Sequence, residues 1–156
     1  MSTLKDILDA AIQGEINAQK LYQRGVDIAQ NDEIKKFFEQ LVKEETNHEN
    51  ILFNLKATEV YNLDVAVTDP DLLEDIRNSH GNTNAAFDES WNMTQVLETA
   101  LKREYAAMNR YRKAAEASTD EELTSLFNNL SIEEASHHKR IEKQFNKVQG
   151  ISEREM

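Results

Sequence analysis

The sequence predicts an all-α protein, a four-helix bundle made of two helical hairpins joined by a long crossover. Three observations support this fold class. One proline and four glycines in 156 residues leave few helix breakers. Apolar residues recur at steps of three and four along four long stretches, which is typical of one-faced helices. The two halves of the chain also match each other at a constant offset of 89 residues.

Length and composition narrow the functional classes. We expect one domain over residues 1–156. The absence of cysteine excludes disulfides, thiolate metal sites and cysteine nucleophiles. A net charge of −11 argues against binding to nucleic acid or to an anionic membrane. Because no stretch approaches the length of a membrane span and the first residues lack a signal-peptide pattern, we expect a cytoplasmic protein.

The first hairpin is expected over residues 3–56. Thr3 is a suitable N-cap for a helix whose apolar stripe runs from Leu4 to Ala29. Asn31 and Asp32 interrupt this stripe, and either can cap a second helix that extends to Leu55. Since the connection is so short, the two helices must be antiparallel neighbours.

Residues 57–92 lose this periodicity and form the predicted crossover. Pro70 precedes a short candidate helix over residues 71–78, which Gly81 would end. Phe87 and Trp91 are expected to cover the bundle where the chain re-enters it. A connection of this length usually crosses another element.

The second hairpin is expected over residues 93–149, capped by Asn92 or Thr94. Its first stripe runs from Val96 to Ala115. A capping box then starts the last helix, through either Ser118 with Glu121 or Thr119 with Glu122. The final stripe consists of Leu123, Leu126, Phe127, Leu130, Ile132, Ile141, Phe145 and Val148.

An offset of 89 residues superimposes the two hairpins without a gap and gives eleven identities. Most are apolar positions that any helical repeat would share. Three identical pairs are polar yet lie on the apolar stripes, where a bundle should place leucine: Glu15/Glu104, Glu45/Glu134 and His48/His137. These six residues are the candidate site.

The spacing of the six residues predicts a shared metal site. Each Glu-x-x-His places a carboxylate and an imidazole one turn apart on the same helix face. From Glu15 to the turn is about 16 residues and back to Glu45 about 14, so both lie at one level of the hairpin. Buried carboxylates this close would repel unless a cation lay between them. One Glu from each of two helices, with Glu-x-x-His from each of the others, is a known ligand pattern for pairs of iron or manganese ions.

With these motifs, the chain resembles the ferritin-like di-iron carboxylate superfamily, and within it the rubrerythrin type, over about residues 3–56 and 94–149. The resemblance implies a ferritin-like fold in which Glu15, Glu45 and His48 serve one metal ion. Glu104, Glu134 and His137 would then serve the other, with Glu45 and Glu134 as bridging ligands. One departure is Ala107, which stands where rubrerythrins carry an additional Glu; its counterpart in the first hairpin is Ala18. This departure puts the rubrerythrin-specific peroxidase mechanism in question.

Several other polar and aromatic residues near the motifs allow a structural or a functional interpretation. Tyr22 and Tyr111 follow Glu15 and Glu104 by seven residues; they either pack in the core or hydrogen-bond to ligand carboxylates, where they could also relay an electron. Glu44 and Glu133 are expected to be solvated or to form ion pairs between helices. The expected surface residues are His80, Glu98 and His138.

Together these features favour a non-haem di-iron oxidoreductase of rubrerythrin type. It would reduce hydrogen peroxide or O2, or oxidise Fe²⁺, with two iron ions as cofactors; manganese or zinc are possible substitutes. Because the chain has no cysteine-ligated rubredoxin domain, electrons would come from a separate donor such as a rubredoxin-like protein. A homodimer is a further expectation from the resemblance. The alternatives are a metal-binding or iron-storage bundle without redox turnover, and a bundle in which the metal only holds the hairpins together.

Overall fold

The computed structural model describes residues 3–58, 60–66 and 88–150. Within these ranges the chain forms four α-helices and no strand, which confirms the predicted all-α bundle of two hairpins. The helices are α1 (Leu4–Ile28), α2 (Asp32–Thr58), α4 (Met93–Ala117) and α5 (Glu121–Val148). The candidate helix at 71–78, His80, Gly81 and Phe87 lie outside the described residues.

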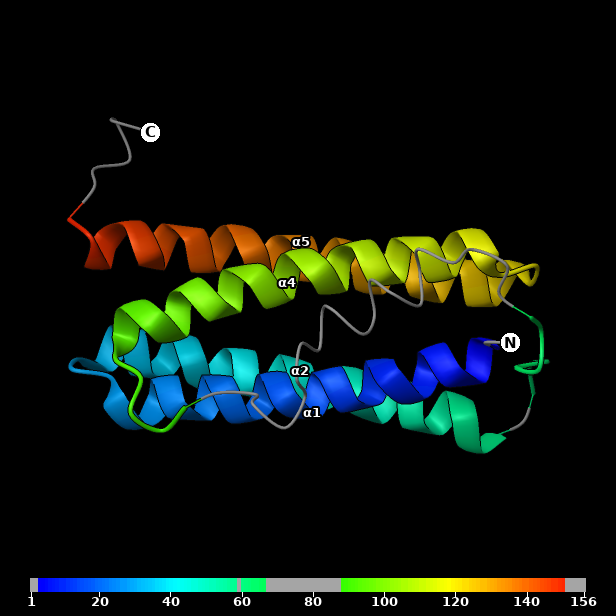
Figure 1. Cartoon of the computed structure of the whole chain (residues 1–156), viewed down its shortest axis with the longest axis horizontal. Coiled ribbons are helices and arrows are strands. Elements are labelled where there is room, and N and C mark those ends of the chain that lie inside the picture. Colours follow the sequence, from blue (N-terminus) through cyan, green and yellow to red (C-terminus); the bar gives the residue numbers. More distant parts are fainter. Residues whose placement is uncertain (1–2, 59, 67–87, 151–156) are drawn as a thin grey trace.

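The helices pack as two antiparallel hairpins laid against each other (Figure 1). Helix α1 packs closely on α2, and α4 packs closely on α5. The hairpins meet mainly along α1 and α4, whereas the backbones of α2 and α5 approach each other at few points. Helix α2 ends at one end of the bundle and α4 begins at the other (Figure 1), as a connection that crosses the bundle requires.

Side-chain caps define three of the helix starts as the sequence indicates. Thr3 and Asp6 form a reciprocal capping box at α1, with N···O distances of 3.0 and 3.3 Å. At α2, the Asn31 side chain accepts a hydrogen bond from the Ile34 amide at 2.9 Å. Asn92 and Gln95 form a second reciprocal box at α4.

The predicted capping box of the last helix is wrong. Asp120 is the N-cap of α5, and its carboxylate accepts a hydrogen bond from the Leu123 amide at 3.0 Å. Ser118 instead ends α4, because its own amide donates to the carbonyl of Ala114. The short connection thus serves both helices, since Ser118 ends α4 and Asp120 caps the start of α5.

The chain that follows α2 returns to the start of α1. The amides of Leu4 and Lys5, which have no partner within their helix, donate to the carbonyls of Val65 and Leu63 at 3.0 and 2.9 Å. Tyr61, Leu63 and Val65 also pack against buried side chains of the bundle. The first turn of α1 is thus held by backbone hydrogen bonds as well as by packing.

The interior consists of two apolar clusters. One gathers Leu4, Leu8, Leu52, Tyr111, Phe127 and their neighbours; the other gathers Leu21, Tyr22, Phe38, Leu97, Ile141 and theirs. Trp91 packs against the second cluster, as expected of a residue where the crossover re-enters. Ile132 is a wrong core prediction, since 67% of it is exposed. It lies two residues after Leu130, about 200° around the helix, and so faces away from the core.

None of the helices within the described ranges combines the length and the apolar character that a membrane crossing requires.

Gly25 of α1 faces the ring of Phe38 in α2, and we expect Gly25→Ala to destabilise the protein. A Cβ atom there would lie 2.6 Å from the ring of Phe38, which is fully buried and has no room to move. Overpacking of this kind costs about 1–3 kcal/mol, more than the roughly 1 kcal/mol that alanine contributes to helix propensity. Chemical denaturation should show a lower free energy of unfolding. Lys20→Ala on the exposed face of α1 is the control and should stay within about 0.5 kcal/mol of wild type.

Candidate metal centre

The six polar residues of the apolar stripes meet in one buried layer of the bundle. Each is at most 2% exposed. Their ligand atoms form two groups, each with all atoms within 4.8 Å of one another. One group contains Glu15, Glu45, His48 and Glu134, and the other contains Glu45, Glu104, Glu134 and His137. Glu45 and Glu134 belong to both groups, the position that bridging ligands would occupy.

Helix geometry explains why the layer forms. Glu15 lies between the buried Ala11 and Ala18 on α1, and Glu45 follows the buried Leu41 on α2 by one turn. The same pattern recurs in α4 and α5, with Glu104 after Ala100 and Glu134 after Leu130. The layer therefore lies between the two apolar clusters, which hold its side chains inward.

The two histidines turn the same ring nitrogen toward the carboxylates. Nδ1 of His48 lies 2.9 Å from Oε1 of Glu134, and Nδ1 of His137 lies 2.7 Å from Oε1 of Glu45. Each imidazole thus faces the shared carboxylate of the opposite hairpin. The rings are nearly parallel, with centroids 5.8 Å apart and an interplanar angle of 11°.

Unpartnered atoms of the layer face a common space. Some N···O distances in the layer are short, but seven of its buried atoms make no hydrogen bond of acceptable geometry. These atoms are Glu15 Oε2, Glu45 Oε1 and Oε2, Glu104 Oε2, Glu134 Oε1, His48 Nδ1 and His137 Nδ1. Buried polar atoms normally have partners. Carboxylate oxygens with one imidazole nitrogen per site suit a divalent ion such as iron or manganese. The residues present therefore fit a pair of metal ions.

The four carboxylates differ in their readiness to ionise. Burial opposes the charge on Glu15, but the neighbouring Glu45 and His48 side chains and the charge of Arg110 outweigh it and lower the pKa to about 2. The pKa of Glu104 is lowered against the same burial, chiefly by His137. Burial, followed by the charges of the neighbouring carboxylates, raises the pKa of both Glu45 and Glu134 well above the usual range.

The histidines offset the remaining charge. Burial alone would lower the pKa of each imidazole. Contacts with Glu134 and Glu15 outweigh burial and raise the pKa of His48, and Glu104 does the same for His137. Without metal, these raised pKa values favour protons on the two shared carboxylates and the two imidazoles, which would reduce the charge of the layer. A metal pair would have to displace these protons.

Tyr22 and Tyr111 bind the outer carboxylates across the hairpin boundary. The Tyr111 hydroxyl of α4 donates to Oε1 of Glu15 in α1 at 2.5 Å, and the Tyr22 hydroxyl of α1 donates to Glu104 in α4. Burial, with the charges of Glu104 and Glu15 respectively, raises the pKa of both phenols. Both hydroxyl groups therefore remain protonated donors that orient these carboxylates.

A second pair of glutamates lies behind the histidines. Oε2 of Glu133 is 2.5 Å from Nε2 of His48, and Oε2 of Glu44 is 3.6 Å from Nε2 of His137. Arg140 donates to both oxygens of Glu44. The expected ion pairing between helices is present, but the contact with the histidines was missed. The repetition of Glu44 as Glu133 in the second hairpin was its only signal.

These outer groups line a groove between α2 and α5. Its volume is about 390 Å³, and its lining includes Lys43, Glu44, Glu133, Arg140 and the two histidines. The imidazoles are nearly buried yet form the floor of the groove. The open side of the layer is therefore the side of the histidines.

Two arginines of α4 flank the opposite side, and sequence reasoning missed both. Arg110 is 3% exposed and lies 4.9 Å from the centre of the Tyr111 ring, while Arg103 is half-buried near Glu104. With Ala18 and Ala107 they line a cavity of about 20 Å³ beside the carboxylates, about the space of one water molecule. In the sequence, the only sign of this side was Arg110 itself, a charged residue on the apolar stripe three residues after Ala107.

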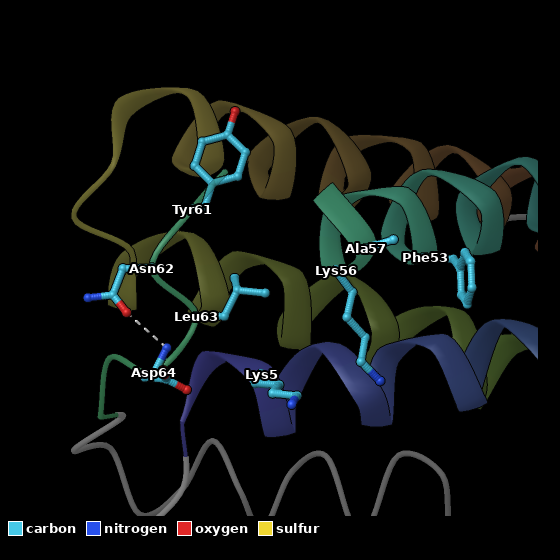
Figure 2. A pocket seen from close by; sticks show the side chains of 8 residues that line it. All are labelled: Lys5, Phe53, Lys56, Ala57, Tyr61, Asn62, Leu63 and Asp64. Atoms are coloured by element: carbon cyan, nitrogen blue, oxygen red, sulfur yellow. Dashed lines mark hydrogen bonds between the residues drawn. The ribbon is translucent and has the colours of Figure 1, made fainter. Parts of the chain in front are cut away.

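The remaining candidate residues lie outside the layer. Glu98 is exposed as expected, and His138 is half-buried beside the ring of Tyr105. Figure 2 shows a separate pocket of about 580 Å³ near the start of α1, lined by Lys5, Phe53, Lys56, Ala57 and residues 61–64. Lys56 there pairs with Asp9 at 2.6 Å. None of the six candidate ligands lines this pocket.

Replacing Tyr22 by Phe should destabilise the metal-free protein. Glu104 would lose a buried hydrogen-bond donor, which costs about 1–3 kcal/mol. Denaturation of the metal-free protein measures this loss. Tyr105→Phe, at a side chain that is 57% exposed, is the matched control and should change the stability little. Equal stability of the two variants would contradict the role assigned to the Tyr22 hydroxyl.

Metal binding should weaken steeply as the pH falls. The pKa values of Glu45, Glu134, His48 and His137 are all raised, so these ligands hold protons that a metal must displace. Release of more than one proton per ion means that the apparent affinity falls more than about tenfold for each pH unit. Co²⁺ titrations between about pH 8 and 6 measure this slope, and calorimetry in buffers of different ionisation enthalpy counts the protons. An affinity that stays constant over this range would contradict the assignment.

Two solved structures have similar folds. A ferritin-like diiron-carboxylate protein from Thermotoga maritima has a TM-score of 0.75 and 19% identity, with 94% of this chain and 97% of that chain covered. A hypothetical protein from Pyrococcus furiosus has a TM-score of 0.69 and 19% identity, covering 96% of this chain and 92% of that one. No curated protein sequence matches the chain. The sequence profile of the rubrerythrin family matches residues 6–87 and 95–155, and the chain therefore belongs to the rubrerythrin family.

Proposed function

We propose that this protein is a non-haem di-iron oxidoreductase that reduces hydrogen peroxide or O2. The observation that carries the proposal is the buried layer of four carboxylates and two imidazoles, whose unpartnered atoms face one space. Membership in the rubrerythrin family supports iron as the metal. A layer kept only for structure would be more stable with apolar side chains, since buried charges rarely repay their desolvation.

The ligands divide between the two ions as the two groups indicate. Glu15 and His48 would hold one ion, Glu104 and His137 the other, and Glu45 and Glu134 would contact both. Four carboxylates balance two divalent ions, so the loaded site is neutral in its reduced state. A pair of iron ions supplies two electrons as Fe²⁺ becomes Fe³⁺, which with two protons converts hydrogen peroxide into two water molecules.

The chain provides the surroundings of this reaction. Tyr22 and Tyr111 hold the outer carboxylates in place by donating hydrogen bonds to them. The small cavity beside Ala18 and Ala107 admits a ligand no larger than a few atoms. Arg103 and Arg110 border that cavity, and their positive charges favour a substrate that gains negative charge as it is reduced.

Electrons for this reaction would come from a separate donor. The chain has no cysteine and so no iron–sulfur or rubredoxin-type centre of its own. We therefore propose a separate one-electron donor, such as a rubredoxin-like protein, which restores the reduced state after each turnover.

The test compares re-oxidation of the iron-loaded protein with that of a Glu45→Ala plus Glu134→Ala double variant. Loaded with Fe²⁺ under anaerobic conditions, the wild type should react with hydrogen peroxide or O2 far faster than the variant. We expect a difference beyond the 10- to 100-fold that loss of an outer partner of a metal ligand causes. Stopped-flow absorbance measures the rates, and metal analysis should give two ions per chain for the wild type.

The control replaces two exposed carboxylates, Glu98→Ala plus Glu142→Ala, which lowers the acidity equally but leaves the layer intact. It should behave as the wild type does. If the wild type binds two ions but reacts no faster than the double variant, the protein is a metal-binding bundle without turnover. That result would overturn the proposed activity.

A further inference from the structure

The two halves of the metal cluster differ at the outer edge of the histidines. Oε2 of Glu133 lies 2.5 Å from Nε2 of His48, well within hydrogen-bond distance. Oε2 of Glu44 lies 3.6 Å from Nε2 of His137, which is too far for a hydrogen bond. The same pair of residue types thus makes a direct contact in one half and not in the other.

Arg140 accounts for this difference. Its Nη1 atom donates to both oxygens of Glu44, at 3.1 and 3.2 Å, and so occupies the carboxylate that would otherwise face His137. Arg140 stands one turn after His137 on α5. The equivalent position after His48, at the offset of 89 residues, is Ile51, which has no charge to offer Glu133. The difference between the two halves therefore corresponds to one sequence difference, Ile51 in the first hairpin and Arg140 in the second.

On the opposite side of the cluster the two halves have the same kinds of residues, although Arg110 is more deeply buried than Arg103. Arg110 acts on Glu15, whose pKa its charge lowers, and Arg103 lies near Glu104. Each outer carboxylate also receives one tyrosine hydroxyl. Each half thus has one arginine and one tyrosine on that side, whereas at the outer edge only His48 has a carboxylate in direct contact.

A carboxylate behind a metal-bound imidazole strengthens the ligand. It accepts a hydrogen bond from the distal ring N–H, fixes the tautomer and the ring orientation, and makes the other nitrogen a stronger ligand for the metal. We propose that Arg140 makes the two metal positions unequal, so that the half built on His48 binds a divalent ion more tightly and fills first. This inference rests on the two-metal site of the proposed function, but it concerns the order of binding and not turnover.

A Co²⁺ titration of the metal-free protein tests the inference with two matched variants. The wild type should bind in two steps whose constants differ by more than the statistical factor for equal sites. Glu133→Gln should weaken the first step about 10- to 100-fold. Glu44→Gln should change either step by less than about threefold, because Arg140 already holds that carboxylate near the surface. Both residues line the groove between α2 and α5, and equal unfolding temperatures of the metal-free variants exclude a change in folding.

Exchanging the residues at positions 51 and 140 provides the converse test. Arg140→Ile copies the first half into the second and releases Glu44 toward His137, so the second step should become stronger and approach the first. Ile51→Arg supplies a cation to Glu133 and should weaken the first step. Proton NMR of the Co²⁺-loaded protein identifies the occupied half. At one equivalent, the shifted ring N–H signal should belong to His48 and disappear in His48→Gln.

Two results would overturn the inference while leaving the metal site intact: equal losses in Glu133→Gln and Glu44→Gln, or a first Co²⁺ at His137. A wild type that binds no Co²⁺ in this layer would instead overturn the proposed function. The two failures are therefore distinguishable in one series of titrations.

Discussion

Four carboxylates in one buried layer are the constraint on which the rest of this structure depends. Each loses its hydration, and each repels the other three at short range, so the metal-free layer is stable only where protons and nearby cations reduce its charge. Two imidazoles inside the layer and two arginines beside it provide that compensation. The apolar clusters on both sides hold the side chains of the layer in place, so that only the side of the histidines opens toward the groove.

The compensation runs across the hairpins as well as within them. Tyr22 reaches Glu104, Tyr111 reaches Glu15, and each histidine faces the shared carboxylate of the other hairpin. A single hairpin therefore contains half of the ligands and one histidine, but it lacks the tyrosine donor of its outer carboxylate and the histidine that faces its shared carboxylate. Docking of the hairpins therefore brings the six ligands and the donors that stabilise them into one layer.

Much of this arrangement follows from the sequence because helices transmit register along the chain. The rise per residue levels Glu15 with Glu45, and the stripe of apolar neighbours turns both inward. Contacts set by the distance between helices do not follow in this way. The pairing of Glu133 with His48 depends on how α2 and α5 separate, and the burial of Arg110 depends on partners in another helix. The Asp120 cap was missed for a local reason, since Ser118 could serve either helix until the end of α4 was known.

The sparse packing between α2 and α5 has a consequence for how the molecule moves. This seam holds both histidines and opens into the groove, whereas the seam between α1 and α4 is closed by apolar contacts and tyrosine hydrogen bonds. Ions shared between Glu45 and Glu134 would act as a cross-link over the weaker seam. Local opening between α2 and α5 would then be rarer in the metal-loaded protein than in the metal-free protein. An ion could enter or leave by such local opening while the rest of the bundle stayed folded.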